Sequence, residues 1–439
     1  AARGQYVFVF VNSRTSAMPQ TLLPILSVSP TRALVDEKME VVVENLPPGF
    51  PVTLHSFHHS EDKDHWEAYG HYITDHRGMV SVAEDFSFGG TYKGKAAMGL
   101  LWSMRPVPGS RKGLRLRKMN VRTPLLVNIS VYSGHSAEGF RERTPLASTL
   151  IERWYIAPGV QRIKLREKGL RGTLFIPSGP GPFPGLLEMW GGGGGLVEYR
   201  ASLLASNGYA CFALEYLVPD EVDTRHNVPM NYFERAFNIL KEHPQVIPDK
   251  IGLFGLSLGS ILAINLATES PIVKPACCVC ISGGHLHLDG PNLNENNDMI
   301  RLDENNHQIW REMGLATFNT SKLVEVGKIN CPLLLVNGDD DQNCIRTMYH
   351  TIIMPCITQK MKAAGKEHLL TCVLYPDAGH LIEPPFSPHF RATRFHKNVI
   401  VVWGGTTEPH SEAQEDSWRK ILAFLQHHLY SSPILQAKM

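Results

Sequence analysis

The sequence predicts an α/β protein of two domains, an all-β sandwich followed by a larger domain built on a mostly parallel sheet. Its 439 residues exceed the roughly 100–200 residues of one ordinary domain. Short alternating strands fill the first third of the chain, and continuous apolar strands alternate with amphipathic helices in the rest. A Gly-X-Ser-X-Gly sequence between one of these strands and a helix is the third observation.

Residues 23–155 carry the pattern of the all-β domain. Alternating stretches such as 39–43 and 125–131 are separated by turn-forming clusters at 47–49 and 88–90. Because strands recur at short spacing with turns between them, a β-sandwich without long helices is predicted.

Residues 160–430 carry the pattern of the α/β domain. Its expected strands are short and apolar: Gly172–Ile176, Gly185–Met189, Ala210–Glu215, Ile251–Phe254, Ala276–Ile281, Pro332–Val336 and Leu370–Leu374. Its expected helices are amphipathic: Tyr199–Ser206, Tyr232–Glu242, Ser257–Thr268 and Ala413–Leu429. Such strands predict a parallel sheet covered on both faces. The polar stretch from His285 to Asn319 is expected to form a surface excursion or lid.

The two ends of the chain are set apart from both domains. Residues 1–22 are treated as an N-terminal extension. Within it, residues 1–17 either precede a true start at Met18 or belong to a signal or transit segment. Residues 431–439 form a C-terminal tail.

Composition excludes several classes of function. A formal charge of +1 leaves no excess of basic residues for a nucleic-acid partner. No apolar run approaches the roughly 20 residues that a membrane-spanning helix needs. Four cysteines lie in apolar runs and are expected to pack as buried thiols rather than to form disulfides or bind metal: Cys211, Cys277, Cys278 and Cys280.

The most specific local motif is Gly255-Leu256-Ser257-Leu258-Gly259, which follows an apolar strand and precedes an Ala-containing apolar helix. This context is required for a nucleophile elbow, in which a sharp turn presents a serine at the edge of the sheet. The alternative is a simple glycine-rich turn. With a strand before it and a helix after it, we predict that Ser257 is the nucleophile of an α/β-hydrolase domain.

A serine hydroxyl needs a base that removes its proton, and His380 is the candidate. It follows the last expected strand, in a loop that can reach Ser257 at the carboxyl edge of the sheet. His410, His427 and His428 belong to the last helix region and are expected at the surface.

A carboxylate should fix the tautomer of the base, and Asp339, Asp340 and Asp341 stand between Ser257 and His380 in the sequence. Three consecutive aspartates cannot all point inward. Local geometry favours Asp340 only slightly, and a solvated turn made of all three is the alternative.

Two backbone N–H groups should stabilise the oxyanion that forms when serine attacks. One is expected at Leu258, directly after the nucleophile. The other is expected in the run Gly191–Gly195, at Gly192 or Gly193. This run lacks both the Lys-Ser/Thr ending of a P-loop and the spacing of a dinucleotide fingerprint, so no nucleotide cofactor or metal is predicted.

Several blocks outside the active site resemble the acyl-CoA thioesterases related to bile acid-CoA:amino acid N-acyltransferase. These blocks are Ala33–Glu37, Met98–Ser103, Glu152–Tyr155, Tyr199–Ala205, Gly379–Pro385 and Trp403–Gly405. The resemblance implies an immunoglobulin-like β-sandwich before an α/β-hydrolase domain. It also implies hydrolysis of fatty acyl-CoA through a triad of Ser257, His380 and Asp340. Transfer of the acyl group to glycine or taurine is the alternative, although the amino-acid-conjugating relatives carry cysteine as nucleophile.

The chain ends in Ala437-Lys438-Met439, which resembles the Ser-Lys-Leu peroxisomal signal. Relatives often end in such tripeptides. We therefore expect a peroxisomal location and recognition by a peroxisomal import receptor, with the cytoplasm as the alternative and the mitochondrion ranked below both.

Overall fold

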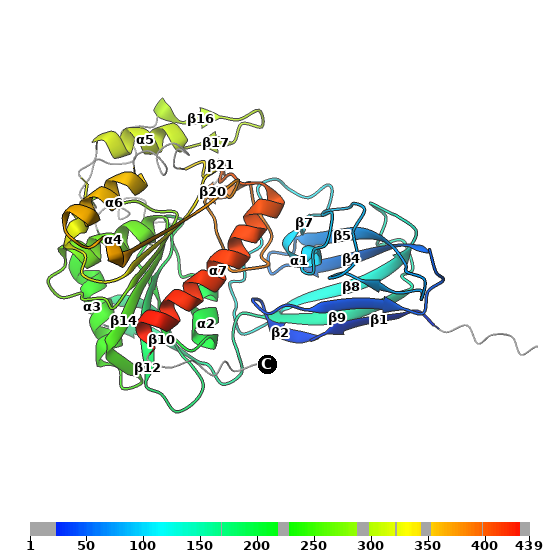
Figure 1. The fold of residues 1–439 in the computed structure, drawn as a ribbon, viewed down its shortest axis with the longest axis horizontal. Coiled ribbons are helices and arrows are strands. Elements are labelled where there is room, and N and C mark those ends of the chain that lie inside the picture. The colour runs from blue at the N-terminus through cyan, green and yellow to red at the C-terminus, as the bar shows by residue number, and fades with distance from the viewer. Residues whose placement is uncertain are drawn as a thin grey trace, which may run out of the picture.

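A β domain and an α/β domain lie side by side in the computed structural model of the chain (Figure 1). The structure describes residues 23–167, 169–217, 228–287, 298–320, 323–343, 353–396 and 398–430. The N-terminal extension, the tail with Ala437–Met439 and part of the expected excursion after His285 lie outside these residues.

The β domain contains two sheets around an apolar core. A three-stranded antiparallel sheet has the order β1 (Ile25–Ser29), β3 (Glu40–Glu44), β6 (Val80–Ser81). A six-stranded sheet has the order β2 (Arg32–Leu34), β9 (Ala147–Trp154), β8 (Leu125–Ser133), β4 (Pro51–His59), β5 (His65–Ile73), β7 (Arg105–Pro106). The only helix among the described residues of this domain is the four-residue α1 (Gly99–Trp102). Alternate residues such as Val41 and Val43 enter the core, as the period of two requires.

The α/β domain is built on an eight-stranded sheet. Its order is β10 (Gln161–Glu167), β11 (Leu170–Ile176), β13 (Ala210–Glu215), β12 (Phe183–Met189), β14 (Val246–Leu256), β15 (Cys278–Ile281), β18 (Leu333–Gly338), β19 (Leu370–Tyr375). β10 and β11 run antiparallel to their neighbours, and the other pairs are parallel. The prediction of a mostly parallel sheet is therefore confirmed.

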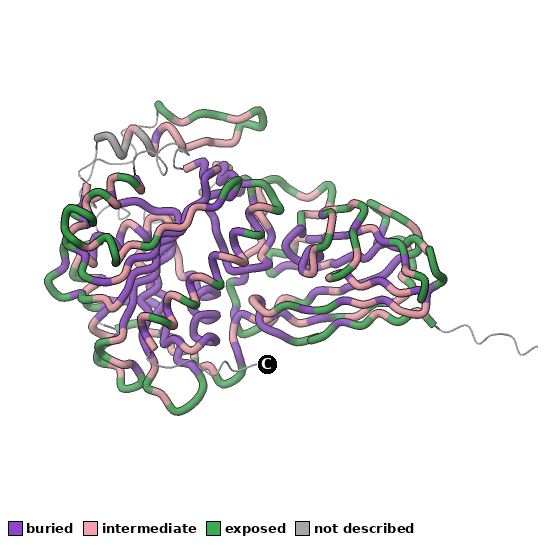
Figure 2. The backbone as a smooth tube through the Cα atoms, in the orientation of Figure 1, coloured by how far each residue is buried: buried purple, intermediate pink, exposed green. Residues whose placement is uncertain are grey.

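Helices cover both faces of this sheet. α2 (Tyr199–Ser206) and α7 (Thr407–Leu429) pack on one face, and α3 (Met230–Glu242), α4 (Leu258–Glu269) and α6 (Met354–Ala363) on the other. An apolar core lies on each face of the sheet. Neighbouring residues of β14 contribute to both cores, since Leu253 faces one and Phe254 the other. This two-sided burial explains why the strands are continuously apolar, and Figure 2 shows buried backbone through the centre of the domain.

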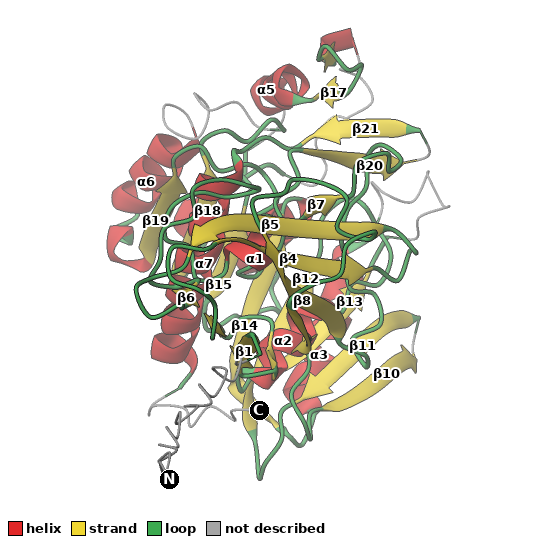
Figure 3. Ribbon diagram, turned by 90° about the vertical axis from the view of Figure 1, so that its right-hand side faces the viewer, coloured by secondary structure: helices red, strands yellow, loops and turns green. Residues whose placement is uncertain are grey.

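Several elements were not expected from the sequence. β10 is an edge strand of mixed polarity. Because most of its residues are partly or fully exposed, it lacks the continuous apolar run by which the other strands were predicted. A small sheet has the order β16 (Arg301–Leu302), β17 (Gln308–Ile309), β21 (Val399–Val402), β20 (Ala392–His396), and α5 (Arg311–Thr320) follows β17. The described part of the expected excursion thus joins a second sheet, which Figure 3 shows at the top of the molecule.

The loop that follows β19 docks onto the β domain. Phe386 and Phe390 are buried in the β-domain core, where Phe390 meets Trp66 edge to face with ring centroids 5.7 Å apart. On the same loop, Glu383 forms an ion pair with Arg115 of the β domain. The loop that carries His380 is therefore positioned by both domains.

His410 of α7 holds the same loop from the other side. Its Nδ1 accepts a hydrogen bond from the Gly379 N–H at 3.0 Å, and its Nε2–H donates to the Leu381 carbonyl at 2.9 Å. The side chain is 2% exposed, so the expectation that His410 lies at the surface is wrong. Burial, followed by the nearby His389, lowers the pKa of His410 to about 3. A neutral ring is needed because one nitrogen accepts and the other donates.

The turn between β14 and α4 depends on two glycines that approach other backbone closely. A Cβ on Gly259 would lie 2.0 Å from the Met189 carbonyl oxygen, and one on Gly255 would lie 2.2 Å from the Gly259 carbonyl oxygen. Between them, Ser257 takes φ 54° and ψ −117°, a conformation that L-residues rarely adopt. Both glycines of the motif are thus explained by lack of space.

We expect Gly259→Ala to lower the free energy of unfolding by about 3 kcal/mol or more, because the new methyl group meets backbone that cannot move aside. Gly192→Ala is the matched control, since nothing lies within 4 Å of a Cβ there. Urea denaturation measures both. Equal stability of the two variants would contradict the account of the turn.

We expect His410→Gln to make stability less dependent on pH. The pKa of His410 is about 3 in the folded protein and 6.5 when unperturbed, so unfolding takes up a proton below about pH 6.5 and stability falls as the pH falls. Between pH 7.5 and pH 5 this group should account for about 2 kcal/mol. Urea denaturation at both pH values should show a correspondingly smaller loss in the variant. An identical loss would mean that His410 is not held neutral.

Candidate functional site

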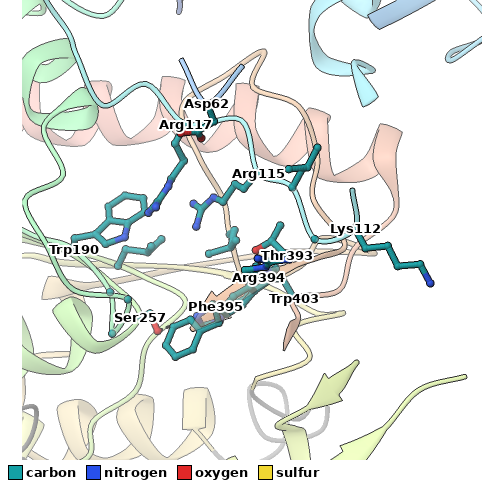
Figure 4. Close-up of a pocket in the computed structure, with 18 of the residues that line it drawn as sticks. Asp62, Lys112, Arg115, Arg117, Trp190, Ser257, Thr393, Arg394, Phe395 and Trp403 are labelled. Carbon is teal, nitrogen blue, oxygen red and sulfur yellow. Dashed lines mark hydrogen bonds between the residues drawn. The ribbon is translucent and has the colours of Figure 1, made fainter. Parts of the chain in front are cut away.

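A cleft of about 310 Å³ opens between the two domains. The α/β domain lines it with Trp190, the glycines that follow, Ser257, His380 and Trp403, and the β domain adds the basic segment 111–117 (Figure 4). The cleft lies beyond the carboxyl ends of β12 and β14, next to the point where the strand order reverses. Ligands of open α/β sheets bind at such points.

Ser257, His380 and Asp341 form a hydrogen-bonded chain. His380 Nε2 lies 2.9 Å from Ser257 Oγ, and His380 Nδ1 lies 2.7 Å from Asp341 Oδ2. Asp341 is fully buried and His380 is 4% exposed. With Nδ1 protonated, the ring donates to Asp341 and Nε2 is free to accept the serine proton. The structure therefore brings together Ser257 and His380, the two residues selected from the sequence.

The aspartate beside His380 is Asp341, and the prediction of Asp340 is wrong. The Asp340 carboxylate faces away from His380, with Arg391 Nη1 at 3.1 Å and the Gly405 N–H at 2.8 Å. Asp341 instead pairs with Gly404 in an isolated β-bridge, and this pairing directs its side chain inward. Asp339 accepts a hydrogen bond from the Asp377 N–H at 2.6 Å. Each aspartate thus has its own partner, set by contacts distant in sequence.

Two backbone segments lie next to Ser257, the start of α4 and the glycine loop after β12. Leu258 is the first residue of α4, and the first four N–H groups of a helix have no partner within it. On the facing loop, Gly191 lies against Ser257, since a Cβ there would be 3.3 Å from Ser257 Cβ. Gly192 and Gly193, the residues expected from the sequence, line the same cleft further along. The Tyr216 hydroxyl anchors the start of this loop by donating to the Trp190 carbonyl.

Two sets of lining residues were not found from the sequence. Thr393, Arg394 and Phe395 come from β20, and Trp403, just after β21, stacks on His380 with ring centroids 5.7 Å apart. The basic residues come from the β domain: Arg111, Lys112, Arg115 and Arg117. These four and Lys118 fall within eight consecutive positions of a nearly neutral chain, and this clustering was the available signal.

The described residues offer neither a metal site nor a membrane-spanning helix. No group of three or more His, Cys, Asp and Glu side chains there is arranged to hold a metal ion. No helix in the same part of the chain has both the length and the apolar character needed to cross a membrane.

Comparison with known proteins places both parts of the chain in one family. Residues 36–167 match the model described as "Acyl-CoA thioester hydrolase/BAAT N-terminal region", and residues 228–431 match "BAAT / Acyl-CoA thioester hydrolase C terminal". The peroxisomal succinyl-coenzyme A thioesterase of Mus musculus is 37% identical, over 93% of this chain and 97% of that protein.

Other relatives show the same extent of similarity. Acyl-coenzyme A thioesterase 2, mitochondrial, of Homo sapiens is 34% identical over 94% of this chain and 86% of that protein. The bile acid-CoA:amino acid N-acyltransferase of Mus musculus is 33% identical over 92% of this chain and 97% of that protein. The chain therefore belongs to the family of acyl-CoA thioester hydrolases and bile acid-CoA:amino acid N-acyltransferases.

Proposed function

We propose that this protein hydrolyses acyl-CoA thioesters to CoA and a free carboxylic acid, with Ser257 as the nucleophile. The observation that carries the proposal is the chain from Ser257 through His380 to Asp341 in the cleft between the domains. The choice of an acyl-CoA thioester as substrate comes from family membership, since most of the relatives named are acyl-CoA thioesterases.

In the first half-reaction, Ser257 Oγ attacks the thioester carbonyl while His380 Nε2 takes the hydroxyl proton. The oxyanion that forms is stabilised by the N–H of Leu258 and by an N–H of the glycine loop. For the second donor we keep Gly192 and Gly193 and add Gly191, because Gly191 packs against Ser257. The C–S bond then breaks, His380 returns the proton to sulfur, and CoA leaves.

In the second half-reaction, water attacks the acyl-serine with His380 as the base. The carboxylic acid leaves and Ser257 recovers its proton. Asp341 keeps the imidazole in the required tautomer and stabilises the imidazolium that forms in each half. No cofactor is needed for either step.

Transfer of the acyl group to glycine or taurine remains the second candidate, because one relative is named as an N-acyltransferase. In that reaction an amine replaces water in the second half. Taurine added to the assay, followed by product mass, distinguishes the two. We favour hydrolysis, since the thioesterases are the more numerous relatives and the nucleophile here is serine.

Three further features belong to this proposal. We place the division between the domains between β9 and β10, and we regard the β domain as immunoglobulin-like, a reading that its two sheets around one core support. We also propose a peroxisomal location with uptake by an import receptor. Its support is the relative named as peroxisomal, beside others named as mitochondrial.

We expect Ser257→Ala to lower the rate of CoA release on the order of a million-fold, because no other group can form the acyl intermediate. A thiol reagent measures the release, and the thermal unfolding midpoint should stay unchanged. Thr268→Ala, which removes a hydroxyl at the far end of α4, is the control and should keep full activity. Release at the normal rate from Ser257→Ala would refute the assignment.

We expect Asp341→Asn to lower kcat on the order of ten-thousand-fold, because an amide favours the wrong tautomer of His380. Asp340→Asn is a matched control one residue away, and it should cost less than about tenfold since Asp340 faces Arg391. Steady-state kinetics of both variants gives the rank order. The reverse order would restore the prediction made from the sequence.

A further inference from the structure

Two arginines of one β-domain segment point into the cleft that holds Ser257. Arg115 and Arg117 line the cleft, whereas Leu116 and Lys118 line a smaller cavity on the other side of the segment. Figure 4 shows both guanidinium groups directed toward the space beside Trp190.

The charge of Arg115 is already compensated. Its guanidinium forms an ion pair with Glu383, and both groups are largely buried, with side-chain exposures of 13% and 6%. The Tyr199 hydroxyl donates to the same carboxylate, at 2.9 Å from one oxygen and 3.0 Å from the other. Glu383 thus already has two partners, and no hydrogen bond or ion pair joins it to Arg117.

Arg117 has no such partner. Among the described residues it makes no hydrogen bond and no ion pair. The carboxylates whose charge acts on it are Glu383, which is paired with Arg115, and the exposed Asp62. Burial, and then the charge of Arg115, lower the pKa of Arg117. A half-buried cation beside another cation is stabilised when an anion binds next to it. The cleft is therefore prepared for an anionic group of its ligand.

A CoA thioester can carry anions at two places, the phosphates of CoA and a carboxylate at the end of the acyl chain. Its phosphates are separated from the reacting sulfur by the long pantetheine arm, and they are multivalent and strongly hydrated. The exposed cations of the same segment suit them, and Figure 4 shows Lys112 directed away from the nucleophile. The Arg111 side chain is 57% exposed. Arg117, which is half-buried inside the cleft, instead suits a single anion on the acyl side.

We propose that the cleft selects acyl-CoA substrates whose acyl chain ends in a carboxylate, and that Arg117 is the residue that recognises it. This inference rests on the proposed function. A guanidinium can donate two parallel hydrogen bonds to a carboxylate, which an ammonium cannot reproduce. Arg115, fixed by Glu383, adds positive potential and keeps the segment in place.

The test compares two substrates with four-carbon acyl chains, succinyl-CoA and butyryl-CoA, which differ by a terminal carboxylate. We expect the wild type to show the higher kcat/KM with succinyl-CoA. Arg117→Gln should lower kcat/KM for succinyl-CoA at least tenfold and leave butyryl-CoA unchanged or slightly improved. Arg117→Lys should fall between, and it provides a second variant if the glutamine variant folds poorly.

Lys112→Gln is the matched control from the same segment. If it meets the phosphates, it should lower kcat/KM for both substrates equally, and added salt should reduce its effect. An equal loss for both substrates in Arg117→Gln would mean that Arg117 binds CoA phosphates and would overturn the proposal. No loss with either substrate would overturn it as well.

The outcomes also separate this inference from the proposed function. Hydrolysis of butyryl-CoA by the wild type without a selective effect of Arg117→Gln would leave the thioesterase standing and remove the acyl-carboxylate site. Hydrolysis of neither substrate, nor of a palmitoyl-CoA control, would remove the proposed function itself. A direct measurement adds to this: inhibition by free succinate, but not by butyrate, should weaken in Arg117→Gln.

Discussion

The docking of the His380 loop onto the β domain is the contact on which the geometry of the cleft depends. Phe386 and Phe390 complete the β-domain core, and the buried ion pair of Glu383 with Arg115 joins the loop to the basic segment. Breaking a buried pair of this kind is costly because it leaves an uncompensated charge. The same contact therefore fixes the position of the histidine and of the arginines opposite it. This gives the β domain a role in the reaction although it supplies no member of the serine–histidine–aspartate chain.

The backbone at Ser257 is held by a second, local constraint. Ser257 sits in a strained conformation between two glycines that cannot carry a side chain, and its loop neighbours pack against β12 and the start of α4. Strain of this kind persists only where the surroundings determine the backbone completely. His410 holds the backbone on either side of His380, because it forms hydrogen bonds with Gly379 and Leu381. The backbone at Ser257 and at His380 is thus fixed by contacts within the protein.

The sequence was sufficient for features that are encoded locally. The elbow is one contiguous motif with a strand before it and a helix after it, and most strands of the large sheet are continuous apolar runs. The family expected from the resemblance is confirmed by the relatives and the family models. The roles of Ser257, His380 and the glycine loop stay predictions, now supported by their geometry.

Features decided by distant contacts could not be read from the sequence. Three consecutive aspartates look alike locally, and only the pairing of Asp341 with Gly404 and of Asp340 with Arg391 distinguishes them. His410 has the appearance of a surface helix residue until the loop above it is known. Arg117 belongs to a different domain from Ser257, so no spacing rule could place the two in one cleft.

In the proposed reaction, an acyl group passes from CoA to Ser257. Rapid mixing of the enzyme with an acyl-CoA, acid quenching within the first turnover and mass spectrometry of the peptides test it most directly. We expect a mass increase equal to one acyl group on the peptide that contains Ser257, formed together with CoA release and lost as the carboxylic acid appears. An acyl adduct on any other residue would contradict it.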